Sequence, residues 1–263
     1  MNRNHLHLWI LLAAAFAAMA CVSVFGPVEV FGYELKDSGF SKILAINPKK
    51  TEAGHTTAKV VAPTKPAAKP KPVEVDTLPK KILFIGDSML DGLYPRLAAY
   101  ADKNGHTLYV VIWYSSTSET WGKSDRLKNY INTIHPDYVF ICLGANELNV
   151  SDIVGKREKY VRKILQDIGS IPYLWIGPPN WKPDTGINGL IESNAAPGSF
   201  FLSNGMTFDR KKDGAHPTQE SAELWMDSVA RWMPQHSSHP IRMDRPTAGG
   251  ARAKRVYVHQ PNK

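Results

Sequence analysis

Between residues 80 and 234, short apolar runs alternate with longer segments whose apolar residues have helical spacing. Unbroken apolar runs of this length are typical of strands that are covered on both faces. They predict strands at 82–85, 108–113, 138–143 and 173–176, and the spacing between them predicts helices at 94–104, 126–134, 156–168 and 220–232. Strands separated by helices predict an α/β fold with three layers, in which a parallel, flavodoxin-like sheet lies between two layers of helices.

The first 25 residues have the composition of a targeting segment. Residues 6–25 are almost wholly apolar, and such a stretch is long enough to span a bilayer as a helix. Ala18-Met19-Ala20 also fits the cleavage pattern of a signal peptide, and Cys21 directly follows it as a candidate lipid-attachment site. An uncleaved anchor, a cleaved signal and a lipoprotein therefore remain open. Each predicts export, with the protein anchored in the inner membrane and facing the periplasm or cell exterior, or secreted.

Composition divides the remainder into three parts. Residues 26–79 predict a membrane-proximal segment followed by a linker rich in Pro, Lys and Ala, which cannot bury a core. Residues 80–234 predict the folded domain. Residues 235–263 predict a basic, disordered tail, because they are rich in His, Arg, Pro and Gly.

The formal net charge of +8 comes largely from the linker and the tail. Since the folded domain is close to neutral, we expect no nucleic-acid partner. The chain has only two cysteines, Cys21 in the targeting segment and Cys142 in an apolar run. A disulfide between them and a cysteine-rich zinc site are therefore both excluded.

Three polar motifs occur where chemistry is expected in such a fold. Gly86-Asp87-Ser88 follows the first strand, Gly144-Ala145-Asn146-Glu147 follows the third, and Asp213-Gly214-Ala215-His216-Pro217 precedes the last helix. The carboxyl ends of parallel strands face the ligand crevice. Taken singly, the serine fits a helix cap, and the histidine and asparagine fit turns. Together they supply a nucleophile, a base with an orienting carboxylate, and an amide donor for an oxyanion, which is acyl-transfer chemistry without a metal or cofactor.

Over residues 80–234, these motifs resemble the signature blocks of the SGNH (GDSL-type) hydrolases. The resemblance implies that Ser88 is the nucleophile and that Asp213 and His216 complete a catalytic triad. It also implies an oxyanion hole made of the Ser88 backbone N–H, the Asn146 side chain and a backbone N–H from a glycine in a further block.

The sequence departs from this pattern in two places. Glu147 stands where the family usually has aspartate, and we expect it to brace the loop. The further block reads Ser115-Ser116-Thr117-Ser118 and has no obvious glycine. We expect Ser118 to take the glycine's position and donate its backbone N–H, with Gly122 as the alternative.

These observations predict a serine esterase that acts on carboxylic ester bonds. By analogy with the family and from the anchor-and-linker layout, the expected substrate is a small acyl group, such as acetyl, on a cell-envelope glycan or peptidoglycan. An O-acetyltransferase with the same residues and a non-catalytic envelope-binding module remain as alternatives. We expect a monomeric catalytic domain whose partners are an acylated glycan or other ester and, through the N-terminal segment, the membrane.

Overall fold

The computed structural model describes residues 28–30, 33–35, 73–203, 205–247 and 250–261, and it divides the chain into two units, 1–67 and 68–263. In the first unit, β1 (Val28–Val30) and β2 (Tyr33–Leu35) form a two-stranded antiparallel sheet. The predicted targeting segment and most of the predicted linker lie outside the described residues. Within the described ranges, no helix combines the length and apolar character needed to cross a membrane.

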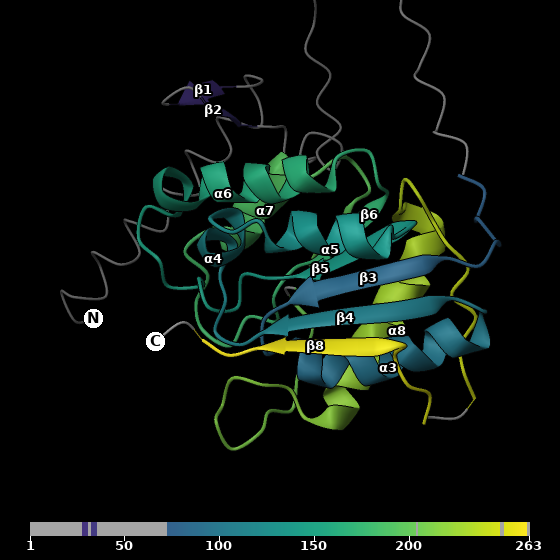
Figure 1. Ribbon diagram of the computed structural model, residues 1–263. Helices are drawn as coiled ribbons and strands as arrows, with labels where there is room; N and C mark the ends of the chain where they lie inside the picture. Colours follow the sequence, from purple (N-terminus) through teal and green to yellow (C-terminus); the bar gives the residue numbers. More distant parts are fainter. Residues whose placement is uncertain (1–27, 31–32, 36–72, 204, 248–249, 262–263) are drawn as a thin grey trace, which may run out of the picture. The chain divides into compact units, whose positions relative to one another are not determined.

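The second unit is built on a six-stranded parallel sheet with the strand order β7-β6-β5-β3-β4-β8 (Figure 1). Its strands are β3 (Lys81–Gly86), β4 (Thr107–Trp113), β5 (Tyr138–Cys142), β6 (Tyr173–Ile176), β7 (Phe200–Phe201) and β8 (Arg255–His259). The chain runs from β3 to β4 on one side and then crosses to β5 on the other. The carboxyl ends of β3 and β5 therefore form the switch point where α/β proteins bind ligands.

Helices cover both faces of this sheet (Figure 1). One layer consists of α3 (Leu90–Lys103) and α8 (Gln219–His236). The other consists of α4 (Ser118–Gly122), α5 (Arg126–Ile134), α6 (Ile153–Ile168) and α7 (Ile187–Asn194). The predicted three-layer α/β/α fold with a parallel sheet is therefore confirmed.

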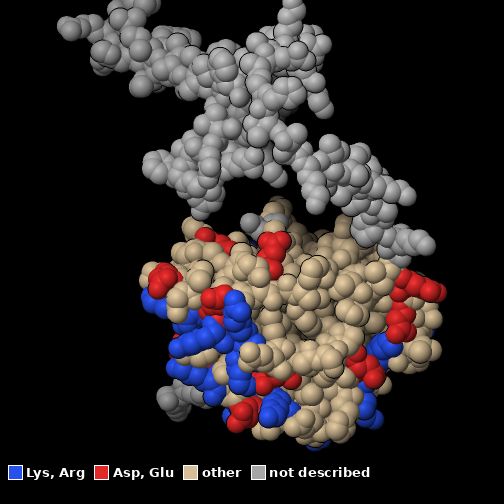
Figure 2. All heavy atoms as spheres, turned by 90° about the horizontal axis from the view of Figure 1, so that it is seen from above, with Lys and Arg blue, Asp and Glu red and all other residues tan. Residues whose placement is uncertain are grey.

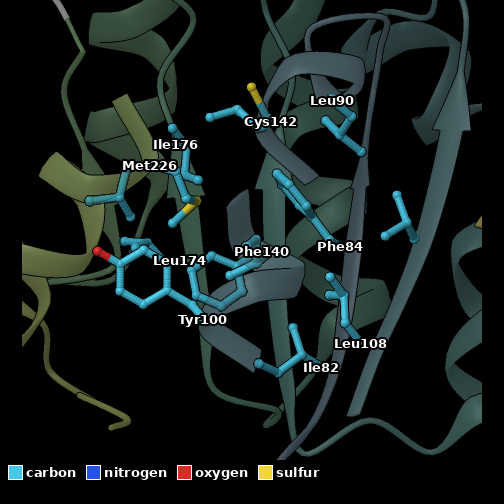
Figure 3. Close-up of a cluster of buried hydrophobic side chains, with 14 of the residues drawn as sticks. Ile82, Phe84, Leu90, Tyr100, Leu108, Phe140, Cys142, Leu174, Ile176 and Met226 are labelled. Atoms are coloured by element: carbon cyan, nitrogen blue, oxygen red, sulfur yellow. The ribbon is translucent and has the colours of Figure 1, made fainter. Parts of the chain in front are cut away.

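The side chains of the central strands alternate between two hydrophobic cores. Ile82 and Phe84 point toward α3 and α8, whereas Leu83 and Ile85 point toward the α4–α7 layer. Figure 3 shows the first of these cores, in which the Phe84 and Phe140 rings lie 6.1 Å apart in an edge-to-face arrangement. Full burial of such a side chain contributes about 1.5–3 kcal/mol, so both layers are held to the sheet largely by these contacts.

The prediction of a disordered tail is wrong. Residues 255–259 form β8, which pairs in parallel with β4 and extends the sheet by one edge strand. Before it, Ile241 is buried and forms a bridge with Asp76, and Arg245 makes an ion pair of 2.9 Å with Asp227 of α8. Composition alone misses these contacts, because the tail gains its order from pairing with a sheet that already exists rather than from a core of its own.

Candidate active site

A tight turn between β3 and α3 positions Ser88. Gly86 ends the strand at a point where a Cβ atom would lie 2.2 Å from the carbonyl oxygen of Cys142 in β5, so only glycine fits. The Asp87 N–H then donates to the same oxygen, at 3.3 Å. Ser88 follows at the mouth of the switch point, immediately before the first turn of α3.

A short hairpin carries the other two triad candidates. Arg210 and Pro217 form an isolated antiparallel bridge, and the N–H of Lys211 donates to the carbonyl oxygen of His216 at 2.8 Å. The Arg210 guanidinium also donates to backbone oxygens of Asn180, at 3.0 Å, and of Ala215. Arg210 thus ties the hairpin to the loop after β6 and fixes its position at the carboxyl edge.

The structure brings Ser88, His216 and Asp213 into one hydrogen-bonded series. The Ser88 Oγ lies 2.8 Å from the His216 Nε2, and the His216 Nδ1 lies 2.8 Å from the Asp213 Oδ2. Because a carboxylate can only accept, the Nδ1 carries the hydrogen and the Nε2 is left to accept the serine proton. This is the arrangement of a nucleophile, a general base and an orienting acid.

Asp213 is held in its ionised form by its own turn. Its Oδ1 accepts the backbone N–H groups of His216 and Ala215, at 2.9 and 2.8 Å. These two hydrogen bonds, followed by the one from the His216 ring, lower the pKa of Asp213 to about 2. A carboxylate that stays charged at all ordinary pH values can stabilise an imidazolium on His216.

Asn146 lies in the loop after β5, as predicted. Its Nδ2 donates to the carbonyl oxygen of Ser116 at 2.9 Å and to the Asp87 Oδ2 at 3.4 Å, so both hydrogens of the amide have partners within the protein. Both acceptors belong to the loops that follow β3 and β4. The Asn146 amide is therefore oriented by the same two loops that surround the nucleophile.

The predicted donor role of Ser118 is contradicted by the structure. Its backbone N–H donates to the Glu147 Oε2 and its hydroxyl to the Glu147 Oε1, both at 2.8 Å, and both residues are 0% exposed. The remaining charge of Glu147 is met by Arg157 of α6, at 2.7 Å. Glu147 therefore braces the loop as expected, and in doing so it occupies the N–H that had been assigned to the oxyanion.

Gly122, the predicted alternative, has a packing role. A Cβ atom there would lie 2.7 Å from the Cβ and 2.9 Å from the Cα of Tyr160, so this glycine allows α4 to approach α6. The residue that the sequence reasoning missed is Ser115. It is exposed and has a φ of 57°, in the left-handed region that favours glycine. Among the described residues, its N–H has no hydrogen-bond partner, which distinguishes it from the N–H of Ser118.

Asp87 is the most perturbed carboxyl group of this site. It is 0% exposed, and its Oδ1 accepts the backbone N–H of Met89 at 2.9 Å. Burial raises the pKa of Asp87 to about 7, and the negative charge of Glu147 acts in the same direction. Since it also faces Asn146, its protonation state bears on the electrostatics of the oxyanion region.

The chain is similar in structure to several solved proteins. The psychrotrophic esterase EstA from Pseudoalteromonas sp. is 19% identical, with 58% of this chain and 97% of that chain covered and a TM-score of 0.42. A lipase/acylhydrolase from Enterococcus faecalis is 20% identical, with coverages of 59% and 95% and a TM-score of 0.48. TesA is 20% identical, with coverages of 57% and 95% and a TM-score of 0.42.

No protein-family model and no curated protein sequence matches the chain. Likenesses at these identities concern the fold. Any assignment of chemistry therefore depends on the side chains that this chain itself places at the switch point.

Proposed function

We propose that this protein is a serine esterase of the SGNH type that removes small acyl groups, such as acetyl, from a cell-envelope glycan. The observation that carries the proposal is the series Ser88–His216–Asp213, in which each side chain is hydrogen-bonded to the next at 2.8 Å. A non-catalytic binding module has no use for a serine that is hydrogen-bonded to an oriented base, so the series supports an enzyme.

In the proposed mechanism, the Ser88 Oγ attacks the ester carbonyl carbon while His216 takes the hydroxyl proton. His216 then returns this proton to the leaving alkoxide, and an acyl-enzyme remains on Ser88. Water, deprotonated by His216 in turn, attacks the acyl-enzyme and releases the acid. Transfer of the acyl group to a sugar hydroxyl would use the same residues.

The oxyanion that forms in each step needs hydrogen-bond donors at the carboxyl edge. We assign the backbone N–H of Ser88, the backbone N–H of Ser115 and the side-chain amide of Asn146, which would exchange its long 3.4 Å hydrogen bond to Asp87 for one to the oxyanion. Ser115 replaces Ser118 in this role, because the Ser118 N–H is bonded to Glu147. Removal of one such donor typically lowers kcat by about 10²–10³-fold.

The exposure of the triad supports a small acyl group on a large substrate. The Asp213 side chain is 49% exposed and that of His216 is 30% exposed. An open site admits a polymer that lies across the surface, whereas a long acyl chain would need an apolar channel to receive it. The predicted export and membrane anchoring fit such a substrate and remain part of the proposal.

Hydrolysis of 4-nitrophenyl acetate tests the chemistry directly. We expect wild-type turnover, and a loss of roughly 10⁴-fold or more in kcat for Ser88→Ala, because triad members act as a unit. Ser170→Ala, which alters an exposed serine after α6, is the matched control and should retain full activity. A fluorophosphonate probe should label the wild-type protein at Ser88, as located by peptide mass spectrometry.

Retention of most of the activity in a folded Ser88→Ala protein would overturn the triad assignment. The glycan part of the proposal has its own test, which is acetate release from acetylated envelope glycans. Activity on 4-nitrophenyl acetate with no release from any acetylated glycan would leave the esterase chemistry standing and refute the substrate.

A further inference from the structure

Basic side chains are concentrated on one of the two helical layers. The helices of the layer α4–α7 contain seven Lys or Arg and four Asp or Glu, a net charge of +3. On the opposite face, α3 and α8 contain three Lys or Arg and five Asp or Glu, a net charge of −2. Figure 2 views the molecule from the α6 side and shows the blue Lys and Arg atoms gathered toward one end of that face.

The positions of these charges run against helix stability. The first turn of α5 contains Arg126 and Lys128 and that of α6 contains Lys156, and the one carboxylate at each of these N-termini belongs to the N-cap residue, Asp125 or Asp152. The positive end of a helix dipole lies at its N-terminus, where anionic side chains are favoured and cationic ones are not. The N-cap aspartates offset part of this unfavourable charge, and the basic residues that follow them still leave each N-terminus with an excess of positive side chains.

The N-termini of α5 and α6 also lie on the side of the sheet that carries the proposed active site. Each helix precedes or follows a parallel strand in a βαβ unit, so its start lies at the carboxyl edge. Arg157 connects the two regions directly, since it pairs with Glu147, the neighbour of Asn146, and with Glu119 of α4, both at 2.7 Å. The basic surface therefore borders the loops that hold the nucleophile and the oxyanion donors.

Two lysines of this surface are free to meet an external anion. The Lys156 Nζ contacts the hydroxyl of Ser151 at 2.9 Å, and the Lys159 Nζ lies 4.9 Å from the centroid of the Tyr160 ring. Within the part of the chain that the structure describes, neither ammonium group has a carboxylate within 4 Å. Both residues are exposed.

We infer that Lys156 and Lys159 form a subsite for a polyanionic glycan chain, whose carboxylate or phosphate groups lie along α6 while an acyl group reaches Ser88. The inference rests on the proposed function and names its substrate class. A row of cations suits a linear polyanion, which presents charges at intervals. The surface is less suited to insertion into a membrane, because Val154 is the one large hydrophobic residue of the described part of α4–α7 that is strongly exposed.

Binding to a polyuronate tests the subsite without any need for turnover. The Ser88→Ala protein would be titrated into fluorescently labelled alginate, a linear polyuronate, and into labelled dextran, its neutral counterpart. We expect binding to alginate that weakens with added salt, and none to dextran. Adding Lys156→Gln and Lys159→Gln together should weaken alginate binding by roughly tenfold or more, since one lysine facing an anionic surface contributes about fivefold.

The matched control is the Ser88→Ala protein with Lys103→Gln and Arg231→Gln, two exposed positions on the opposite layer. It loses the same charge and should keep the parent's affinity, and unchanged thermal unfolding would show that both variants are folded. Equal weakening in the two variants would overturn the inference, and so would a failure to bind alginate. Phosphatidylglycerol vesicles serve as a third ligand, and binding to these vesicles without binding to alginate would also overturn it. Because these titrations use an inactive protein, a failure of the esterase proposal would appear only in the 4-nitrophenyl acetate assay.

Discussion

Replacing Asp87 by asparagine should change how the stability of this protein depends on pH. Asp87 is fully buried, and in the part of the chain that the structure describes no Lys or Arg lies within 4 Å of its carboxylate. Burial raises the pKa of Asp87 from 3.8 to about 7. Such a rise corresponds to about 4 kcal/mol, the amount by which ionising Asp87 lowers the stability of the folded state relative to the unfolded chain.

The sign follows from which state holds the proton. Between pH 4 and pH 7, the folded protein keeps a proton on Asp87 that the unfolded chain has already lost. The stability that protonated Asp87 contributes to the fold is therefore fully present below pH 4. It is lost progressively as the pH rises from 4 to 7, and it is absent at higher pH. Asparagine has no proton to lose, so the stability of the wild type relative to Asp87→Asn should fall by about 4 kcal/mol between pH 4 and pH 8.

Urea unfolding of both proteins at several pH values between 4 and 8 measures this difference. Other titrating groups, such as the buried His106, contribute equally to both proteins and cancel. Asp102→Asn, an exposed position near the C-terminal end of α3, the helix that follows Asp87, is the matched control and should follow the wild-type curve. A difference between wild type and Asp87→Asn that stays constant to within about 1 kcal/mol would refute the reasoning.

Three further perturbations test the architecture around the site. Ser118→Ala should lower the free energy of unfolding by about 1.5–3 kcal/mol, because the buried Glu147 carboxylate loses a hydroxyl donor; an unchanged urea midpoint would contradict this. Gly122→Ala should cost about 1–3 kcal/mol through its clash with Tyr160, whereas Gly189→Ala, with open space around it in α7, should be neutral or stabilising. A chain ending at residue 247 should show a lower melting temperature by calorimetry, because it lacks β8; equal melting temperatures would mean that β8 adds nothing.

Apolar periodicity was sufficient to predict the centre of the fold. The helix 126–134 and the strand 173–176 have the predicted bounds, and the strand 82–85 extends by one residue at each end. Because these elements are packed against the sheet or against helices, their buried positions must be apolar, and the apolar periodicity of their sequences is therefore strong. The short elements α4, α7 and β7 were missed, since two to eight residues carry too weak a periodicity to predict an element.

The edge strand β8 shows a different limit. Its residues Arg255-Val256-Tyr257-Val258-His259 include three consecutive residues that favour strands, although Val256 and Val258 are exposed and only Tyr257 and His259 are half-buried. The surrounding His, Arg, Pro and Gly residues favour disorder, and a pattern five residues long is too short to outweigh that composition. Pairing with β4 supplies the hydrogen bonds that make so short a strand stable, and no property of the tail itself reveals that partner.

The triad was predictable because its residues are identified by type and order, and the structure confirms that Ser88, His216 and Asp213 meet. The backbone donor that we propose for the oxyanion was not, because a backbone N–H is assigned by conformation rather than by residue type. Ser115 has a φ of 57° although it is not glycine, and no sequence pattern predicts this left-handed backbone conformation.

Glu147 explains why the backbone N–H of Ser118 is not free to meet an oxyanion. Its carboxylate accepts both the N–H and the hydroxyl of Ser118 while its charge is met by Arg157. A buried carboxylate needs such donors, because an unpaired charge in the interior is far more costly than a lost hydrogen bond. The first turn of α4 therefore holds the Asn146–Glu147 loop, and the N–H that we propose as the oxyanion donor of this segment is that of Ser115, which has no hydrogen-bond partner among the described residues.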